Sequence, residues 1–159
     1  MHYVHKLKGH RYISVVAHGS SNYWHAVDLR YAVLREPLGL NYTREQLLAE
    51  DKDIHIIYYT DSIVMATLML TPAEKGYIKM RQVAVDEQYQ GAGIGAKLVE
   101  FSEAYALDLG YKHMEMHARK SAVPFYLKQG YKIIGDEFME VTITHFKMSK
   151  DLLEAWKDR

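Results

Sequence analysis

The chain has 159 residues, 48% of them hydrophobic, which suits a single compact domain over residues 1–159 with a sizeable buried core. Its 20 basic and 20 acidic residues cancel, which argues against a nucleic-acid binder, because that class carries a basic excess. Cysteine is absent, so disulfides, thiolate metal ligands and cysteine nucleophiles are excluded.

No segment predicts insertion into a membrane. The best apolar run, residues 63–70, is far too short to span a bilayer. Residues 1–10 are polar and basic and lack the apolar core of a signal peptide. Together with the absence of cysteine, these features favour a cytoplasmic protein.

The first part of the chain predicts one strand followed by two helices. Residues 11–17 are strand-like, and residues 23–35 repeat apolar side chains at helical spacing. Thr43 followed by Gln46 forms a capping box, which starts a short second helix that runs through Glu50.

Three strands follow in the prediction. Residues 54–60 and 63–70 are rich in β-branched and aromatic side chains and form a hairpin across Asp61–Ser62. Residues 77–85 make the third strand. These consecutive strands favour antiparallel pairing.

The clearest helix is predicted at residues 93–109, where Ile94, Leu98, Phe101, Tyr105 and Leu109 form one apolar stripe. The remaining predicted elements are a strand at 113–118, a helix at 121–129, strands at 131–134 and 141–148, and a short polar helix at the end. The order β-α-α-β-β-β-α-β-α-β-β predicts an α+β fold with a mixed sheet flanked by helices in three layers.

A glycine loop joins the strand that ends at Val85 to this helix. It reads Gln90-Gly91-Ala92-Gly93-Ile94-Gly95-Ala96. Glycine lets the backbone approach an anion closely, and the first N–H groups of a helix lack partners inside the helix. The loop therefore predicts a phosphate-binding site.

The loop has two other interpretations, a turn without a ligand and a dinucleotide-binding motif. A plain turn needs fewer glycines. Gly91, Gly93 and Ala96 also fit a dinucleotide fingerprint, with Glu115 as the ribose ligand. Against it, five residues separate Val85 from Gly91, several strands precede the loop, and too few residues follow it for a doubly wound sheet.

The loop resembles the signature Q/R-x-x-G-x-G/A of the GNAT superfamily, with Gln90, Gly93 and Gly95 at its fixed positions. The element order is also similar to that of the family's fold, which implies a mixed, mostly antiparallel sheet. The resemblance implies that the loop binds the pyrophosphate of acetyl-CoA. It also implies that the strand Val83-Ala84-Val85 pairs with the pantetheine arm and offers an N–H to the acyl carbonyl.

A second segment, from Ala118 to Tyr131, is similar to another motif of the family, Ala-x-x-Phe-Tyr-x-x-x-Gly-Phe/Tyr. Ala122, Phe125, Tyr126, Gly130 and Tyr131 match it. The family's usual asparagine is replaced by Arg119, and either Arg119 or Lys120 could meet a phosphate instead. Arg119 and Ser121 are the candidate coenzyme contacts of this segment. The resemblance implies that Tyr126 is the general acid that protonates the departing thiolate, as a tyrosine protonated at neutral pH can.

Many members of the family place a glutamate on the strand before the loop, which could act as the general base. Residues 79–82 of this chain contain no carboxylate, so the resemblance does not specify the base, and water is one alternative. The C-terminal segment resembles a bacterial subgroup that ends in Glu-x-x-Ile-x-His-x-x-Met. Its Glu137, Glu140 and His145 are candidates for the base or for substrate contacts. No metal is expected, because His113 and His117 lie far apart on a strand.

The sequence therefore predicts an N-acetyltransferase that uses acetyl-CoA and an amine, with no metal, no nucleic-acid or membrane partner, and a fold compatible with a homodimer. Two alternatives are a non-catalytic acyl-CoA sensor of the same fold and an NAD-dependent oxidoreductase. The residues predicted to shape the acceptor side are Tyr23, Trp24, Arg30, Arg35, Glu36 and Tyr42.

Overall fold

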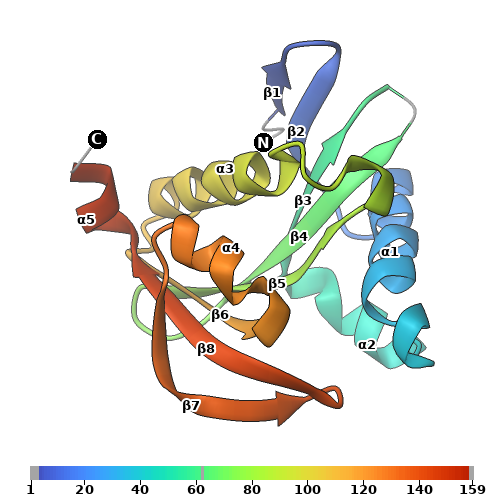
Figure 1. Ribbon diagram of the computed structural model, residues 1–159. Coiled ribbons are helices and arrows are strands. Elements are labelled where there is room, and N and C mark those ends of the chain that lie inside the picture. Colours follow the sequence, from blue (N-terminus) through green and yellow to red (C-terminus); the bar gives the residue numbers. More distant parts are fainter. Residues whose placement is uncertain (1–3, 62, 158–159) are drawn as a thin grey trace. The chain divides into compact units, whose positions relative to one another are not determined.

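The computed structural model describes residues 4–61 and 63–157 (Figure 1). The chain divides into two compact units, Met1–Thr71 with Gln82–Ser102 and Pro72–Arg81 with Glu103–Arg159. Strand β5 (Tyr77–Val85) and helix α3 (Ile94–Asp108) run from one unit into the other. Over the described residues the strands form one mixed, mostly antiparallel sheet in the order β1-β2-β3-β4-β5-β6-β8-β7.

The first unit is built on antiparallel strands. They are β1 (Val4–Leu7), β2 (Arg11–Val16), β3 (Ile54–Tyr59) and β4 (Val64–Pro72). Consecutive strands pair with each other, and Ile56, Ile57 and Leu68 are buried in the core between the sheet and its helices. β-branched and long apolar side chains on both faces of β3 suit a strand that is covered on both sides.

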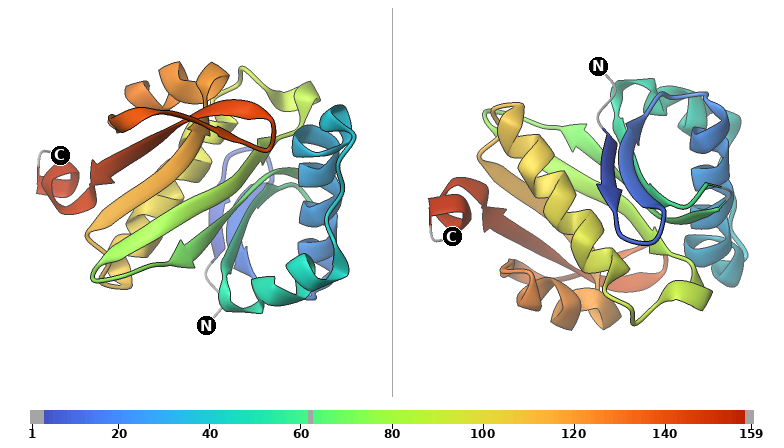
Figure 2. Two further views of the ribbon diagram at one scale, coloured as in Figure 1. Left: turned by 90° about the horizontal axis from the view of Figure 1, so that it is seen from below. Right: turned by 90° about the horizontal axis from the view of Figure 1, so that it is seen from above.

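The helices of this unit begin where the sequence places their caps. The Ser20 hydroxyl accepts a hydrogen bond from the Tyr23 amide at the start of α1 (Ser21–Leu34). The Thr43–Gln46 capping box starts α2 (Arg44–Leu48), with bonds of 3.1 and 2.8 Å. Short 3-10 helices follow each one, η1 (Glu36–Leu38) and η2 (Ala49–Lys52). Both α1 and α2 lie along one side of strands β2 to β4 (Figure 2).

A buried ion pair ties α1 to the segment after α2. The Arg30 guanidinium donates to Glu50, and the Tyr23 hydroxyl donates to the same carboxylate at 2.8 Å. All three residues are buried. Burial and the nearby carboxylate raise the pKa of Tyr23, so its hydroxyl remains a donor. The carbonyl of Glu50 accepts a bond from Nε2 of His55 at 2.9 Å, and burial lowers the pKa of that histidine.

The second unit contains the start of β5, β6 (His113–Arg119), β7 (Lys132–Glu140) and β8 (Ile143–Asp151). Strand β5 pairs in parallel with β6, whereas β8 pairs antiparallel with both β6 and β7. The helices of this unit are η4 (Lys120–Ala122), α4 (Val123–Lys128), α5 (Leu152–Lys157) and the second half of α3.

The two faces of this sheet differ sharply. Met114, Met116 and Ala118 of β6 and Met148 of β8 are buried on one face. The alternate residues of the same strands, among them His117, point to the other face, where side chains are polar and partly exposed. The first face is a packing surface, and the second is available for polar chemistry.

The predicted fold class is confirmed, and most elements lie where expected. Strand β1 was not predicted, because a short, exposed edge strand leaves no clear alternation of apolar residues. The Asp61–Ser62 turn falls partly outside the described residues, although the Thr60 amide donates to the Ile63 carbonyl at 2.9 Å. Leu109 was wrongly included in the apolar stripe, since it is 50% exposed.

The boundary between the last two strands was also wrong. The sequence prediction ended the first of them at residue 134 and began the last at Val141. Instead β7 continues to Glu140, and Val141 and Thr142 form the turn, with φ of 52° and 62°. A β-branched residue at positive φ is unusual, so sequence preference argued against a turn at this point. Glu140 is therefore a strand residue rather than a turn carboxylate.

Replacement of Glu50 by alanine should destabilise the protein strongly, by about 3–5 kcal/mol, because it leaves the buried Arg30 charge unpaired. Denaturant unfolding measures the free energy directly. The matched control is Glu36→Ala, which removes an exposed carboxylate and should change stability by less than about 0.5 kcal/mol. Equal effects of the two substitutions would contradict the structural role of the ion pair.

Candidate functional site

The glycine loop begins where β5 leaves the sheet. The Asp86 amide donates to the Met65 carbonyl at 2.9 Å, which keeps the end of β5 on β4. The short helix η3 (Glu87–Tyr89) follows, and the Gln90 side chain donates back to the Val85 carbonyl at 3.0 Å. The loop is thereby held to the strand end at two points before the glycines begin.

Two glycines of the loop adopt a backbone that other residues rarely tolerate. Gly91 has φ of 83° and Gly93 has φ of 79°. A Cβ at either position would meet nothing within 4 Å, so backbone conformation rather than space requires glycine here. The chain then enters α3 at Ile94, whose buried side chain anchors the first turn.

The backbone of residues 91–96 presents a run of free donors. None of these six N–H groups donates to another residue in the part of the chain that the structure describes. The first bond that closes the helix is from the Lys97 amide to the Gly93 carbonyl, at 3.2 Å. Unpaired N–H groups at the positive end of a helix favour a bound anion, and a pyrophosphate supplies several acceptor oxygens.

Strand β5 carries an irregularity directly before Val83. Gln82 has φ of 54°, which breaks the regular strand geometry. Its side-chain oxygen accepts a bond from the Tyr42 hydroxyl at 2.8 Å. The Tyr42 ring in turn lies 4.8 Å from the Arg30 guanidinium and 5.0 Å from that of Arg35. The α1–α2 connection thus positions the residue that precedes Val83-Ala84-Val85.

The predicted acceptor-side residues do not share one environment. Tyr23 and Arg30 are buried in the ion pair with Glu50 and belong to the core of the first unit. Trp24 is 46% exposed, and Arg35 and Tyr42 are partly exposed. Of the two arginines, Arg35 is therefore the one placed at the surface.

Tyr126, the predicted acid, lies on α4 in the second unit and is only 6% exposed. Its ring contacts those of Phe125 and Tyr131 edge-on, at centroid distances of 5.0 and 5.8 Å. Burial raises the pKa of Tyr126, so its proton is retained at neutral pH. The hydroxyl forms no hydrogen bond with any other described residue, which leaves it free to donate to a ligand.

Tyr131 holds this aromatic cluster in place. Its hydroxyl donates to Glu103 at 2.7 Å, and Lys150 donates to the other oxygen of the same carboxylate at 2.9 Å. Lys150 also donates to the Gln129 carbonyl at 2.7 Å, at the end of α4. Burial and the Glu103 charge raise the pKa of Tyr131. These contacts are structural, in contrast to the unpaired hydroxyl of Tyr126.

The candidate base residues lie on the polar face of the second unit. An Oε2 of Glu140 lies 2.7 Å from Nδ1 of His117. His145 is only 5% exposed, and its Nδ1 lies 2.8 Å from the Ile143 carbonyl. His117 was considered in the sequence only as a metal ligand. The signal available was its alternation with Glu115 and Arg119 along one strand, which places all three on one face.

The two candidate coenzyme contacts of this unit lie at the end of β6. Arg119 is the last residue of the strand and pairs in register with His145. Ser121 lies in η4 and is exposed.

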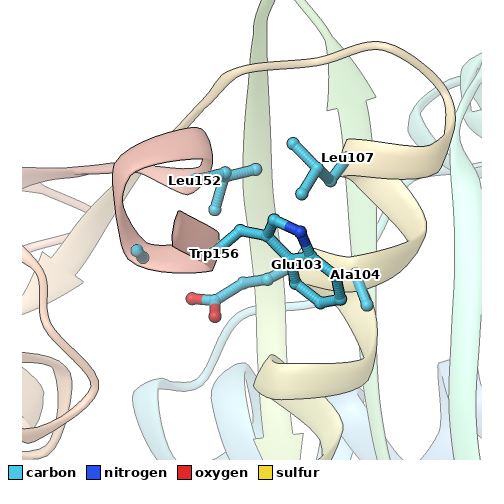
Figure 3. Close-up of a pocket in the computed structure, with 6 residues that line it drawn as sticks. Glu103, Ala104, Leu107, Leu152 and Trp156 are labelled. Atoms are coloured by element: carbon cyan, nitrogen blue, oxygen red, sulfur yellow. The ribbon is translucent and has the colours of Figure 1, made fainter. Parts of the chain in front are cut away.

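A shallow hollow lies between α5 and the second half of α3. It is lined by Glu103, Ala104, Leu107, Leu152, Ala155 and Trp156. Figure 3 shows the Trp156 side chain reaching from α5 toward α3. Because the Glu103 carboxylate is already bound by Tyr131 and Lys150, this hollow offers no free catalytic group.

Comparison with known proteins identifies the family. Residues 34–152 match the acetyltransferase (GNAT) domain model, which is well over half of the chain. The chain belongs to the GNAT acetyltransferase family. The match includes the glycine loop, β6, α4 and the last two strands.

Individual relatives agree with this assignment. The Bacillus subtilis (strain 168) protein named uncharacterized N-acetyltransferase YjcF is 35% identical over 77 residues, which cover 48% of this chain and 55% of that protein. A second protein of the same strain, YyaT, is 31% identical over 46% of this chain and 50% of its own length. The chain spans about half the length of these curated relatives.

Solved structures share the fold. A structure from Lactobacillus plantarum named for an N-acetyltransferase is 25% identical and has a TM-score of 0.79, covering 88% of this chain and 98% of the other. An Elizabethkingia anophelis GNAT acetyltransferase solved with acetyl-CoA is 15% identical, with a TM-score of 0.70 and coverage of 91% and 99%. The mixed sheet and these likenesses contradict the doubly wound fold that the dinucleotide fingerprint requires.

Within the described residues, no helix is long and apolar enough to cross a membrane.

Replacement of Gly93 by alanine should weaken coenzyme A binding by about tenfold or more, because a Cβ at this φ strains the donor loop by about 1–2 kcal/mol. Gly39→Ala is the matched control, since Gly39 has φ of 70°, open space and a place outside the loop. Both variants should lose similar stability, whereas only Gly93→Ala should lose affinity in a calorimetric titration. Unchanged affinity in Gly93→Ala would contradict the assignment of the loop.

Proposed function

We propose that this protein transfers an acetyl group from acetyl-CoA to a primary amine of a small molecule or peptide, by direct attack within a ternary complex. The run of unpaired N–H groups at residues 91–96 supports this most strongly, because it suits the coenzyme's pyrophosphate. Family membership supports the reaction class. The metal-free chemistry needs only groups that the chain already carries.

The proposed coenzyme contacts are mostly backbone groups. Backbone groups of Val83-Ala84-Val85 hold the pantetheine arm, and an N–H of this strand polarises the acyl carbonyl as negative charge develops. The pyrophosphate is bound by the loop from Gln90 to Ala96. Arg119 and Ser121 are the proposed side-chain contacts, with Arg119 supplying positive charge to a phosphate.

Tyr126 is the proposed acid. Its buried hydroxyl keeps its proton and has no partner among the described residues, so it can donate to the sulfur as the C–S bond breaks. The proton thus stabilises the leaving thiolate at the moment when charge develops on it. Tyr131, five residues further on, is already bound to Glu103 and serves as a structural support.

The test is a transfer assay on the full chain with acetyl-CoA and four amines: spermidine, tyramine, glycine and a peptide with a free N-terminal alanine. Thiol release and the mass of the product are followed together. An acetylated amine formed in proportion to released thiol would support the proposal. Tight acetyl-CoA binding with no transfer to any of the four amines would favour the sensor function instead.

Tyr126→Phe should lower kcat by about 100-fold or more and leave the dissociation constant of acetyl-CoA nearly unchanged, because only the donated proton is lost. Steady-state kinetics and calorimetry separate the two quantities. The control, Tyr131→Phe, should lower thermal stability and keep kcat within about threefold. A Tyr126→Phe enzyme with normal kcat would exclude Tyr126 as the acid.

A further inference from the structure

We propose that His117, oriented by Glu140, is the base that removes the proton from the acceptor ammonium group. This assignment rests on the proposed transfer reaction and gives it the proton acceptor that the sequence left open. It changes the role of Glu140 from candidate base to positioning residue.

The hydrogen bond between the two side chains fixes which nitrogen is basic. Nδ1 of His117 lies 2.7 Å from Oε2 of Glu140. A carboxylate accepts a hydrogen bond, so Nδ1 carries the hydrogen and donates. In the neutral ring, Nε2 then holds the free electron pair. An imidazole held in one tautomer by a carboxylate is the arrangement that catalytic triads use for general base catalysis.

The His117–Glu140 pair is partly exposed. The side chains of His117 and Glu140 are 37% and 43% exposed, so solvent and an acceptor can reach the pair. No described residue forms a hydrogen bond with Nε2 of His117. The Phe138 ring meets the imidazole edge-on at a centroid distance of 4.9 Å and restricts its rotation. The ring is thus held by Glu140 and Phe138 while the side chain stays partly exposed.

The surrounding charges leave the pair intact. On the same face, Lys147 of β8, which pairs in register with His117, lies 3.6 Å from Glu115. Two residues further along the same strands, Arg119 of β6 and His145 of β8 lie opposite each other in register. On β5, Lys79 lies opposite Glu115 in register, and Arg81 follows two residues later on the same face of the strand. The carboxylate that contacts the His117 ring is that of Glu140.

His145 is less suited to the same role. It is buried, and its Nδ1 is bound to the Ile143 carbonyl of its own strand. Its ring lies nearly parallel to Phe138, at a centroid distance of 6.0 Å. This stacking makes His145 a support for Phe138 and, through that ring, for His117.

The acceptor ammonium gives one proton to Nε2 of His117 and becomes a neutral amine. Its nitrogen forms a bond to the acyl carbon, and the C–S electron pair leaves on sulfur, which takes a proton through Tyr126. The nitrogen loses a second proton to solvent as the amide forms, Tyr126 regains one from solvent, and His117 releases its proton to water.

The pH dependence of kcat/KM tests this assignment, with the most active of the four probe amines as substrate. The acid limb of the profile reports the base of the free enzyme. His117→Asn keeps an N–H donor for Glu140 but has no basic nitrogen. It should lose the acid limb and about 100-fold in kcat/KM near pH 7, with the deficit shrinking at high pH as the free amine deprotonates.

Glu140→Gln distinguishes the two residues. If His117 is the base, this variant should keep the acid limb with a lower kcat/KM, because the basic nitrogen remains but the carboxylate that orients the ring is lost. Loss of the limb in Glu140→Gln with a normal limb in His117→Asn would show that Glu140 is the base and overturn the proposal. Normal profiles in both variants would also overturn it, while wild-type transfer would still support the proposed function.

Two further measurements separate catalysis from folding. His113→Asn is the control, because His113 lies on the same face of β6 with its ring stacked 4.6 Å from Tyr77, and it should behave as wild type. NMR spectra of His117→Asn and Glu140→Gln should keep the signal dispersion of the folded wild-type protein, so that a loss of activity reports catalysis and not unfolding.

Discussion

The proposed function depends on the unsatisfied backbone donors where the glycine loop enters α3. A helix leaves its first N–H groups without internal partners, and in most proteins a side chain or water covers them. Here positive φ at Gly91 and Gly93 extends the run of donors into the loop itself. The bond from Gln90 to the Val85 carbonyl fixes the loop to the strand end, and the buried Ile94 fixes the helix. The donors are therefore held in place before an anion arrives, so little ordering is needed on binding.

A second constraint is the contrast between the faces of the sheet in the second unit. Methionine and alanine side chains on β6 pack into the core, while histidine, glutamate and arginine alternate with them on the other face. The same strand thus packs into the core with one face and presents polar, titratable side chains on the other. Tyr126 and Tyr131 show a similar division, because one hydroxyl is bound by Glu103 and the other has no protein partner among the described residues.

The sequence predicted the features that follow from local rules. The capping box at Thr43, the place of the glycine loop between strand and helix, and the long helix after it were all confirmed, since each depends on residues close together in the chain. The turn at Val141–Thr142 was not found, because its β-branched and hydroxyl residues adopt positive φ only under the constraint of the two long strands around it. That error displaced Glu140 into a turn and concealed its contact with His117.

Contacts between segments far apart in the chain could not be predicted from the sequence either. The ion pair between Arg30 and Glu50 joins residues 20 positions apart, and nothing in their spacing distinguishes them from surface charges. His117 and Glu140 are 23 positions apart and meet because β6 and β7 lie on either side of β8 in the same sheet. The position of the glycine loop could be predicted from sequence, whereas the environment of the candidate base required the structure.

Calorimetric titration of the full chain with acetyl-CoA, and separately with NAD, tests most directly whether the loop binds an acyl coenzyme and not a dinucleotide. We expect one acetyl-CoA bound per chain with a micromolar dissociation constant, and no measurable heat of binding for NAD. Tight binding of NAD without binding of acetyl-CoA would contradict the proposed role of the loop.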